Sequence, residues 1–242
     1  MVHMINDNWR PYLEGTAFSR GLTLSLSPHD QPVQSHLEVI KEALAGKTVI
    51  HVGCCDHLPL IDQKRAQGTW LHDTLCGFTR RCLGLDINRE AVDYLTARLG
   101  YKDIICHDLT SPALPPEITS RKWDAMFMGD MLEHLDDPVQ FLSEVHGIYK
   151  GQVDRLLVSG PHAFSFQNFM FMLKNQECVN TDHRYWFTVY TLAKILTRAG
   201  FKPVFYALAN RAPLTARRDT LPELVTRLFP ACHDSIVMGA MF

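Results

Sequence analysis

The sequence predicts an α/β protein with a doubly wound, seven-stranded, mostly parallel sheet and an antiparallel C-terminal strand. Short apolar segments alternate with amphipathic ones between residues 48 and 159, which is the pattern of βαβ units. After residue 200, the apolar segments Lys202–Ala209 and Ser235–Phe242 follow each other without a usual crossover helix. Two consecutive strands of this kind indicate an antiparallel edge.

The predicted elements follow in a regular order along the chain. Helices are expected where apolar residues recur at helical spacing, at Gln31–Leu44, Arg89–Leu99, Pro138–His146 and Thr188–Ala199. The last of these begins at Thr188, a residue type that caps helix N-termini well. The other strands are expected at the apolar segments Thr48–Val52, Arg81–Leu85, Asp103–His107, Trp123–Met128 and Arg155–Ser159.

Length and charge limit the class of protein. A chain of 242 residues that is 46% hydrophobic can bury one full core, so we expect a single domain over residues 1–242, with residues 1–30 as an N-terminal arm. The formal net charge of -2 provides no broad positive field for nucleic acid or an anionic membrane. Neither a signal-peptide pattern nor a run of about 20 apolar residues is present, which predicts a soluble, cytoplasmic protein.

The seven cysteines have no spacing typical of a metal site or a disulfide framework. They form no Cys-x-x-Cys pair, and most lie inside apolar segments. Such cysteines are usually reduced thiols that pack as small apolar side chains.

Polar residues and glycines follow the carboxyl ends of the predicted central strands, where open α/β sheets bind ligands. Gly53 follows the first strand, Asp86 the second, Asp108 the third, and Gly129 with Asp130 the fourth. A carboxylate after the second strand can accept hydrogen bonds from both hydroxyls of a ribose. A carboxylate after the third strand can accept one from the amine of adenine. Either aspartate alone could instead be an ordinary turn or cap residue. Together with Gly53 they favour a nucleoside ligand.

The segment HVGCCDH, residues 51–57, lacks the G-x-G-x-x-G pattern of a dinucleotide site. That pattern lets the backbone approach a pyrophosphate at a helix N-terminus. A nucleoside without a phosphate does not need it. A nicotinamide oxidoreductase is therefore disfavoured, although it stays an alternative.

In these segments the chain resembles the class I S-adenosylmethionine-dependent methyltransferases, which have a Rossmann-like fold. HVGCCDH is similar to the first motif of the family, LGLDIN to the second, IICHDL to the third and WDAMFMGDMLEHLDDPVQFLSEV to the fourth. VSGPHAF and TDHRYWFTVYTLAKILTRAGF extend the resemblance, which covers about residues 46–205. It implies S-adenosylmethionine as cofactor, bound by His51, Gly53, Cys55, Asp86, Ile87, Asp108, Leu109 and Gly129.

The first motif departs from the family pattern at three positions. His51 stands where the family usually has an acid that orients the methionine part of the cofactor, and Cys55 and His57 replace two glycines. A side chain at a position that needs a positive φ is costly, so either the loop path or the cofactor position should differ. The loop resembles those of methyltransferases encoded with bacterial surface-glycan genes, which implies a role in glycan biosynthesis. A noncatalytic nucleotide-binding or scaffold protein with a decayed cofactor loop is the alternative.

Methyl transfer to a hydroxyl also needs a group that removes the hydroxyl proton. His134 follows the fourth predicted strand, and His183 lies in an aromatic segment, residues 160–187, that we expect to cover the acceptor. With Asp130, these are the predicted catalytic residues. His134 could instead cap the following helix. Asp182 cannot be assumed to pair with its neighbour His183, because adjacent residues of a strand point to opposite faces.

A divalent-metal site is a further alternative. Asp130, Glu133 and His134 would share one helical face if a helix began there, and His183 could complete a set of hard ligands. A solvated loop with a capping carboxylate is the simpler interpretation, so no metal is assigned.

The acceptor is expected to be a small molecule or a sugar. Nucleic acid is disfavoured because only Arg211, Arg217 and Arg218 form a local basic cluster. The apolar C-terminal strand could also pair with a second copy of the chain in a homo-oligomer.

Overall fold

The computed structural model describes residues 2–26, 34–56, 58–211 and 221–242, which divide into two compact units. The first unit contains Met1–Ile40, Asp130–Ser143 and Val158–Met241. The second contains Lys41–Gly129, Glu144–Leu157 and Phe242. A single domain over residues 1–242 stays a prediction.

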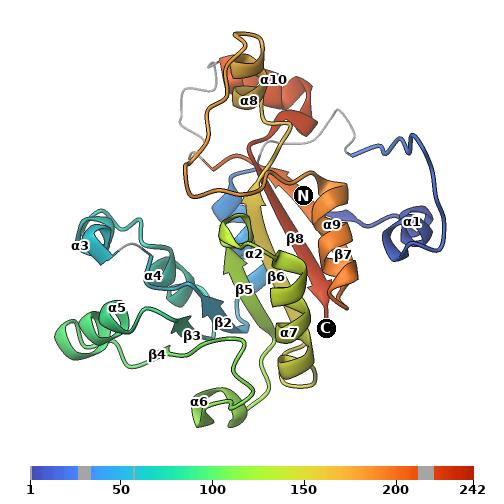
Figure 1. The fold of residues 1–242 in the computed structure, drawn as a ribbon. Coiled ribbons are helices and arrows are strands. Elements are labelled where there is room, and N and C mark those ends of the chain that lie inside the picture. Colours follow the sequence, from blue (N-terminus) through green and yellow to red (C-terminus); the bar gives the residue numbers. More distant parts are fainter. Residues whose placement is uncertain (1, 27–33, 57, 212–220) are drawn as a thin grey trace. The chain divides into compact units, whose positions relative to one another are not determined.

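The second unit contains a parallel sheet with the strand order β5-β2-β3-β4 (Figure 1). Its strands are β2 (Thr48–Val52), β3 (Arg81–Asp86), β4 (Ile104–Cys106) and β5 (Ala125–Gly129). All of β2 is buried, as expected for a parallel strand that is covered on both faces. The register pairs Val52 with Leu85 and Asp86 with Cys106, so the polar residues that follow these strands lie at one edge of the sheet.

Short helices follow the strands of the second unit. They are α3 (Leu58–Ala66), α4 (Leu71–Cys76), α5 (Arg89–Asp93) with a π-helical turn at Tyr94–Arg98, and α6 (Pro116–Thr119). Trp70 is buried in a core cluster with Cys54, Ile61 and Leu95, and its indole N–H donates to the Cys54 carbonyl at 3.0 Å. This bond fixes the start of α4 against the loop that follows β2.

The first unit has an antiparallel edge, with the strand order β1-β7-β8-β6. Its strands are β1 (His3–Met4), β7 (Lys202–Ala209), β8 (Ser235–Met241) and most of β6 (Arg155–Pro161). The antiparallel pairing of β7 with β8 confirms the predicted C-terminal edge. The described residues contain eight strands and not seven, because β1 pairs with β7. Two residues are too few to show a strand period in the sequence.

The helices of the first unit are α1 (Arg10–Glu14), α8 (Phe166–Met172), α9 (Val189–Arg198) and α10 (Leu221–Leu228). Thr188 caps α9 as predicted, since its hydroxyl oxygen accepts the Thr191 N–H at 3.1 Å. The helices α2 (His36–Leu44) and α7 (Pro138–Tyr149) have residues in both units.

The outcome of two predictions is limited by the described residues. The helix expected from Gln31 ends at Leu44 as predicted, but α2 begins at His36, and residues 27–33 lie outside the described residues. Arg217, Arg218 and His57 also lie outside them. Within the described ranges, no helix has both the length and the apolar character needed to cross a membrane.

Candidate functional site

The loop after β2 takes a path of its own. It leaves the strand at Gly53, whose φ of 68° is left-handed, and a Cβ added there would meet nothing within 4 Å. The second left-handed residue is Asp56, at φ 56°, and not Cys55. Cys55 therefore has none of the strain of a positive φ. This agrees with the expectation that the path of the loop differs. The Asp56 carboxylate pairs with Lys64, which helps to hold the strained position.

Asp86 lies at the end of β3 and holds this loop. Its Oδ2 accepts the Cys55 N–H at 3.0 Å, and its Oδ1 accepts the Asn88 N–H at 2.9 Å. An ionised carboxylate offers about four acceptor positions, so Asp86 retains capacity for two hydroxyl donors. Ile87 is 71% exposed and places an apolar side chain beside this carboxylate.

The other predicted cofactor residues at this edge have defined local roles. The N–H and hydroxyl of Thr110 donate to Asp108 Oδ1 at 2.9 and 2.8 Å, and they lower the pKa of that carboxyl, which is therefore ionised at neutral pH. Leu109 is buried. A Cβ at Gly129 would lie 2.8 Å from the Phe127 ring, so packing alone accounts for the glycine.

His51 does not behave as a replacement for an acid at the surface of a cofactor site. It is buried in β2, and its Nδ1 lies 3.1 Å from Nδ1 of His72 in α4. Burial lowers the pKa of His51 well below its usual value, so the imidazole is neutral. Its contact with a cofactor stays a prediction.

In the first unit, Asp130 forms an ion pair with Arg211. Its Oδ1 accepts Arg211 Nη2 at 2.8 Å, and its N–H donates to the Ser159 carbonyl at 3.1 Å. Its φ is 50°, and the helical turn that follows begins only at Leu132. The premise that Asp130 shares a helical face with Glu133 and His134 is therefore wrong, because the chain turns sharply between them.

His134 lies at the end of this short turn and forms a pair that the sequence did not predict. Its Nδ1 is 2.9 Å from Asp182 Oδ2, and its ring meets the His183 ring edge to face, with centroids 4.7 Å apart. Asp182 thus pairs with His134 and not with its chain neighbour. Arg184 fixes the same turn, because its backbone N–H donates to the Glu133 carbonyl at 2.7 Å and its Nη1 to the His134 carbonyl at 2.5 Å.

Glu133 is the most unusual residue of this cluster. It is fully buried, and neither carboxylate oxygen has a hydrogen-bond partner within the described residues. Burial, with a smaller contribution from the Asp130 charge, raises the pKa of Glu133 to about 7. His183 Nδ1 is likewise buried and unpartnered among the described groups, and burial lowers the pKa of His183. Ligand atoms of Glu133, His134 and His183 all lie within 4.8 Å of one another. The three side chains are therefore close enough to share a proton or to bind one cation together.

The aromatic segment and the N-terminal arm both contribute to the surface of the first unit. No residue of α8 is buried, although the helix contains four large apolar side chains, Phe166, Phe169, Met170 and Phe171, before Met172. Phe164 and the arm line a cavity of about 720 Å³, together with the start of α9. Neither His134 nor His183 lines this cavity.

Comparison with known proteins supports the fold. A family model described as a methyltransferase domain matches residues 66–152. A SAM-dependent methyltransferase structure from Aquifex aeolicus is 16% identical with a TM-score of 0.51, and covers 88% of this chain and 94% of its own. One from Mesorhizobium loti is 15% identical with a TM-score of 0.51, over 85% and 95% of the two chains.

A third structure, a SAM-dependent methyltransferase from Thermotoga maritima, is 15% identical with a TM-score of 0.53, over 86% of this chain and 87% of its own. Comparison with curated proteins gives no significant match. The likeness to the solved structures confirms the predicted fold class, a mostly parallel α/β sheet with an antiparallel C-terminal edge.

Proposed function

We propose that the protein is an S-adenosylmethionine-dependent methyltransferase that methylates a hydroxyl of a small polar acceptor. The observation that carries the proposal is the carboxylate of Asp86, held by two backbone N–H groups at the end of β3 with capacity for two further donors. The methyltransferase-domain match to residues 66–152 includes this residue and Asp108.

The residues at this edge suit a nucleoside. Gly53 has open space in front of its Cα, which suits a close approach of the ligand to the backbone. Asp86 would accept the ribose hydroxyls, and Asp108, ionised and exposed, would accept the adenine amine. No phosphate-binding glycine pattern is required.

S-adenosylmethionine supplies a methyl group on a positive sulfur, so the new carbon–oxygen bond forms as the carbon–sulfur bond breaks and its electron pair returns to sulfur. His134 would take the hydroxyl proton on Nε2, because Nδ1–H donates to Asp182 at 2.9 Å. Asp182 would hold this tautomer and stabilise the imidazolium that forms. His183, neutral and with Nδ1 unpartnered in the described structure, would bind or orient the acceptor.

A sugar or glycan intermediate is the acceptor that we propose first. The support is the resemblance of the loop HVGCCDH to loops of methyltransferases encoded with surface-glycan genes. The fold itself does not select an acceptor, because it hosts many functions. Transfer of a labelled methyl group to a panel of free sugars and nucleotide sugars tests this part directly. We expect labelled product from the sugar panel, and labelling only of another acceptor class would contradict it.

The role of His134 needs a separate test. In the His134→Gln variant we expect cofactor binding to be retained and transfer to be lost. His146→Gln is the matched control, since His146 lies on α7 outside the cluster. Unchanged transfer in His134→Gln would remove this residue from the catalytic set.

A second candidate is a divalent-metal-assisted methyltransferase. It is favoured by the two unpartnered oxygens of buried Glu133, which a cation bound also by His134 and His183 would satisfy. A bound cation would make the acceptor hydroxyl more acidic, so that its proton could pass to solvent water while His134 served as a ligand. A chelator should then abolish transfer, and added divalent ions should restore it. Full transfer by the metal-free protein would exclude this mechanism.

A further inference from the structure

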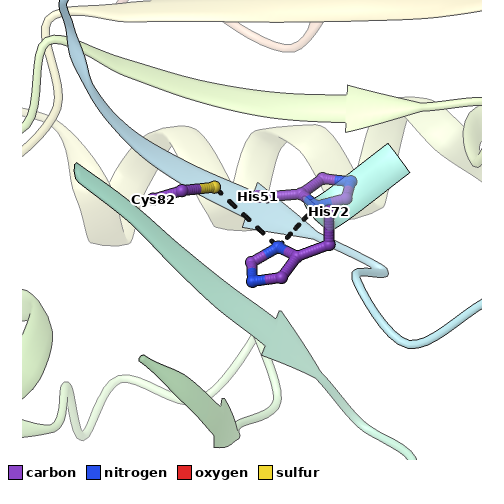
Figure 2. Close-up of side chains that lie close together, drawn as sticks. All are labelled: His51, His72 and Cys82. Atoms are coloured by element: carbon purple, nitrogen blue, oxygen red, sulfur yellow. Dashed lines mark hydrogen bonds between the residues drawn. The ribbon is translucent and has the colours of Figure 1, made fainter. Parts of the chain in front are cut away.

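A second cluster of ligating side chains lies in the core of the second unit, beneath the loop after β2. It consists of His51 on β2, His72 on α4 and Cys82 on β3, and all three are at most 4% exposed. The two Nδ1 atoms are 3.1 Å apart, and Cys82 Sγ is 3.8 Å from His72 Nδ1. Figure 2 shows both contacts converging on the ring of His72.

Two polar partners compete for one ring nitrogen of His72. A ring nitrogen of neutral histidine has either one proton or one lone pair, so Nδ1 of His72 can make one good bond. Two partners approach it, the nitrogen of His51 and the sulfur of Cys82. A metal ion among the three atoms would accept a separate lone pair from each of them.

The distances are close to those of ligands around one ion. At the angles of about 120° of a three-coordinate ion, bond lengths of about 2.0–2.1 Å to nitrogen and about 2.3 Å to sulfur place two nitrogens about 3.5–3.6 Å apart and nitrogen and sulfur about 3.7–3.8 Å apart. The separations in the protein are 3.1 Å and 3.8 Å. Shifts of a few tenths of an ångström would therefore complete the coordination.

The surroundings of His72 fit the same role. A histidine that binds a metal through one nitrogen usually donates its other N–H to a fixed acceptor. His72 Nε2 lies 3.7 Å from Cys76 Sγ, which can accept that proton. Gly84 on β3 leaves space for both Cys54 and His72, because an added Cβ would lie 2.7 Å from Cys54 Sγ and 2.9 Å from His72 Cε1.

We propose that His51, His72 and Cys82 form a buried, three-coordinate site for monovalent copper. A thiolate and two imidazoles are soft or borderline ligands, which suit this ion. Binding would release the Cys82 thiol proton to solvent, so one positive ion and one thiolate leave the core neutral. A divalent ion held by these three groups alone would leave one net positive charge, which only ionisation of the neighbouring Cys76, whose thiol contacts Cys82 and His72, could offset; a buried uncompensated charge is costly.

The test is a titration of the reduced, full-length chain with Cu(I) without oxygen, in competition with a chromophoric Cu(I) chelator. We expect one equivalent to bind, and X-ray absorption should show one sulfur and two nitrogen ligands. Cys82→Ser should weaken binding by roughly 100-fold or more, because loss of even an outer-shell partner of a metal ligand costs about 10–100-fold. Cys178→Ser, at an exposed cysteine outside the cluster, should bind as the natural chain does.

Three results would overturn the proposal. The first is unchanged Cu(I) affinity in a folded Cys82→Ser variant. The second is coordination by two sulfurs that is lost in a Cys54→Ser, Cys55→Ser double variant, since those neighbouring thiols would then be the site. The third is the absence of Cu(I) binding, with or without binding of Zn(II). The absorption spectrum of the unmodified protein decides the question even if a variant does not fold.

Discussion

The two candidate sites differ in how their polar groups are satisfied. At the cofactor edge of the second unit, backbone N–H groups hold the carboxylates of Asp86 and Asp108. In the histidine cluster of the first unit, Glu133 and His183 have buried polar atoms that lack partners within the described residues. The backbone already fixes the carboxylates of the first site. The second site has polar atoms without hydrogen-bond partners, which a ligand or a proton could satisfy. Changes at the first should therefore affect binding, and changes at the second should affect turnover and pH dependence.

Asp86→Ala should have the largest effect. Each hydrogen bond to a charged group contributes about 1.5–3 kcal/mol, so loss of two ribose contacts should weaken cofactor binding by roughly 10²–10⁴-fold. Calorimetric titration with S-adenosylhomocysteine measures this. Asp103→Ala is the control, because Asp103 is an exposed carboxylate that pairs with Arg81. Retained affinity in Asp86→Ala would contradict the position of the whole site.

His134→Gln should reduce turnover by about 10²–10⁴-fold, the usual contribution of a general base, with little change in cofactor affinity. Asp182→Asn should also lower turnover, since it removes the carboxylate that accepts from His134 Nδ1. Single-turnover rates with the labelled cofactor separate this effect from product release. Equal losses of binding and turnover in both variants would indicate a structural role.

Glu133→Gln should change the pH dependence of stability. The pKa of Glu133 is raised to about 7 in the folded protein from 4.5, so its protonated form stabilises the fold at low pH. This contribution to the free energy of unfolding is present below about pH 4.5 and is lost as pH rises through 7. At 1.36 kcal/mol per pKa unit, the loss is up to about 3 kcal/mol. The variant should therefore gain stability relative to the natural chain over this window. Denaturant unfolding at several pH values measures it, and a constant difference would contradict the assignment.

Thr188→Ala should have the smallest effect. It removes the N-cap of α9 and should cost about 1 kcal/mol of unfolding free energy, within the usual range for such caps. Thermal unfolding measures the loss. Turnover at low temperature should be unchanged, and a drop as large as the one expected for His134→Gln would contradict a purely structural role for this cap.

The sequence predicted those helices and strands in which apolar residues recur at a regular spacing. The parallel strands, α9 with its cap and the antiparallel edge all follow from patterns of several residues. The strand β1 could not be predicted, because two residues have no period and their pairing is set by β7. The path of the loop after β2 could not be predicted either. The left-handed residue that follows Gly53 is Asp56, and an aspartate does not require a positive φ.

The sequence indicated several residues of the candidate sites but not how those residues pair. The end of each parallel strand indicated Asp86 and Asp108, because the fold brings such ends to one edge. The pairing of His134 with Asp182 joins positions 48 residues apart and leaves no local pattern. The cluster of His51, His72 and Cys82 draws on three elements, and the cysteine spacing argued against a metal site built from cysteines. The burial of Glu133 left no local signal, because a glutamate beside His134 in a short turn is usually exposed.

Calorimetric titration of the full chain with S-adenosylhomocysteine and with NAD, each against the natural protein and Asp86→Ala, tests the cofactor assignment most directly. We expect one equivalent of the adenosyl compound to bind the natural protein, Asp86→Ala to lose that binding, and NAD to give no heat of binding. Binding of NAD alone would contradict the methyltransferase assignment, and the absence of binding by either compound would favour a scaffold protein with a decayed loop.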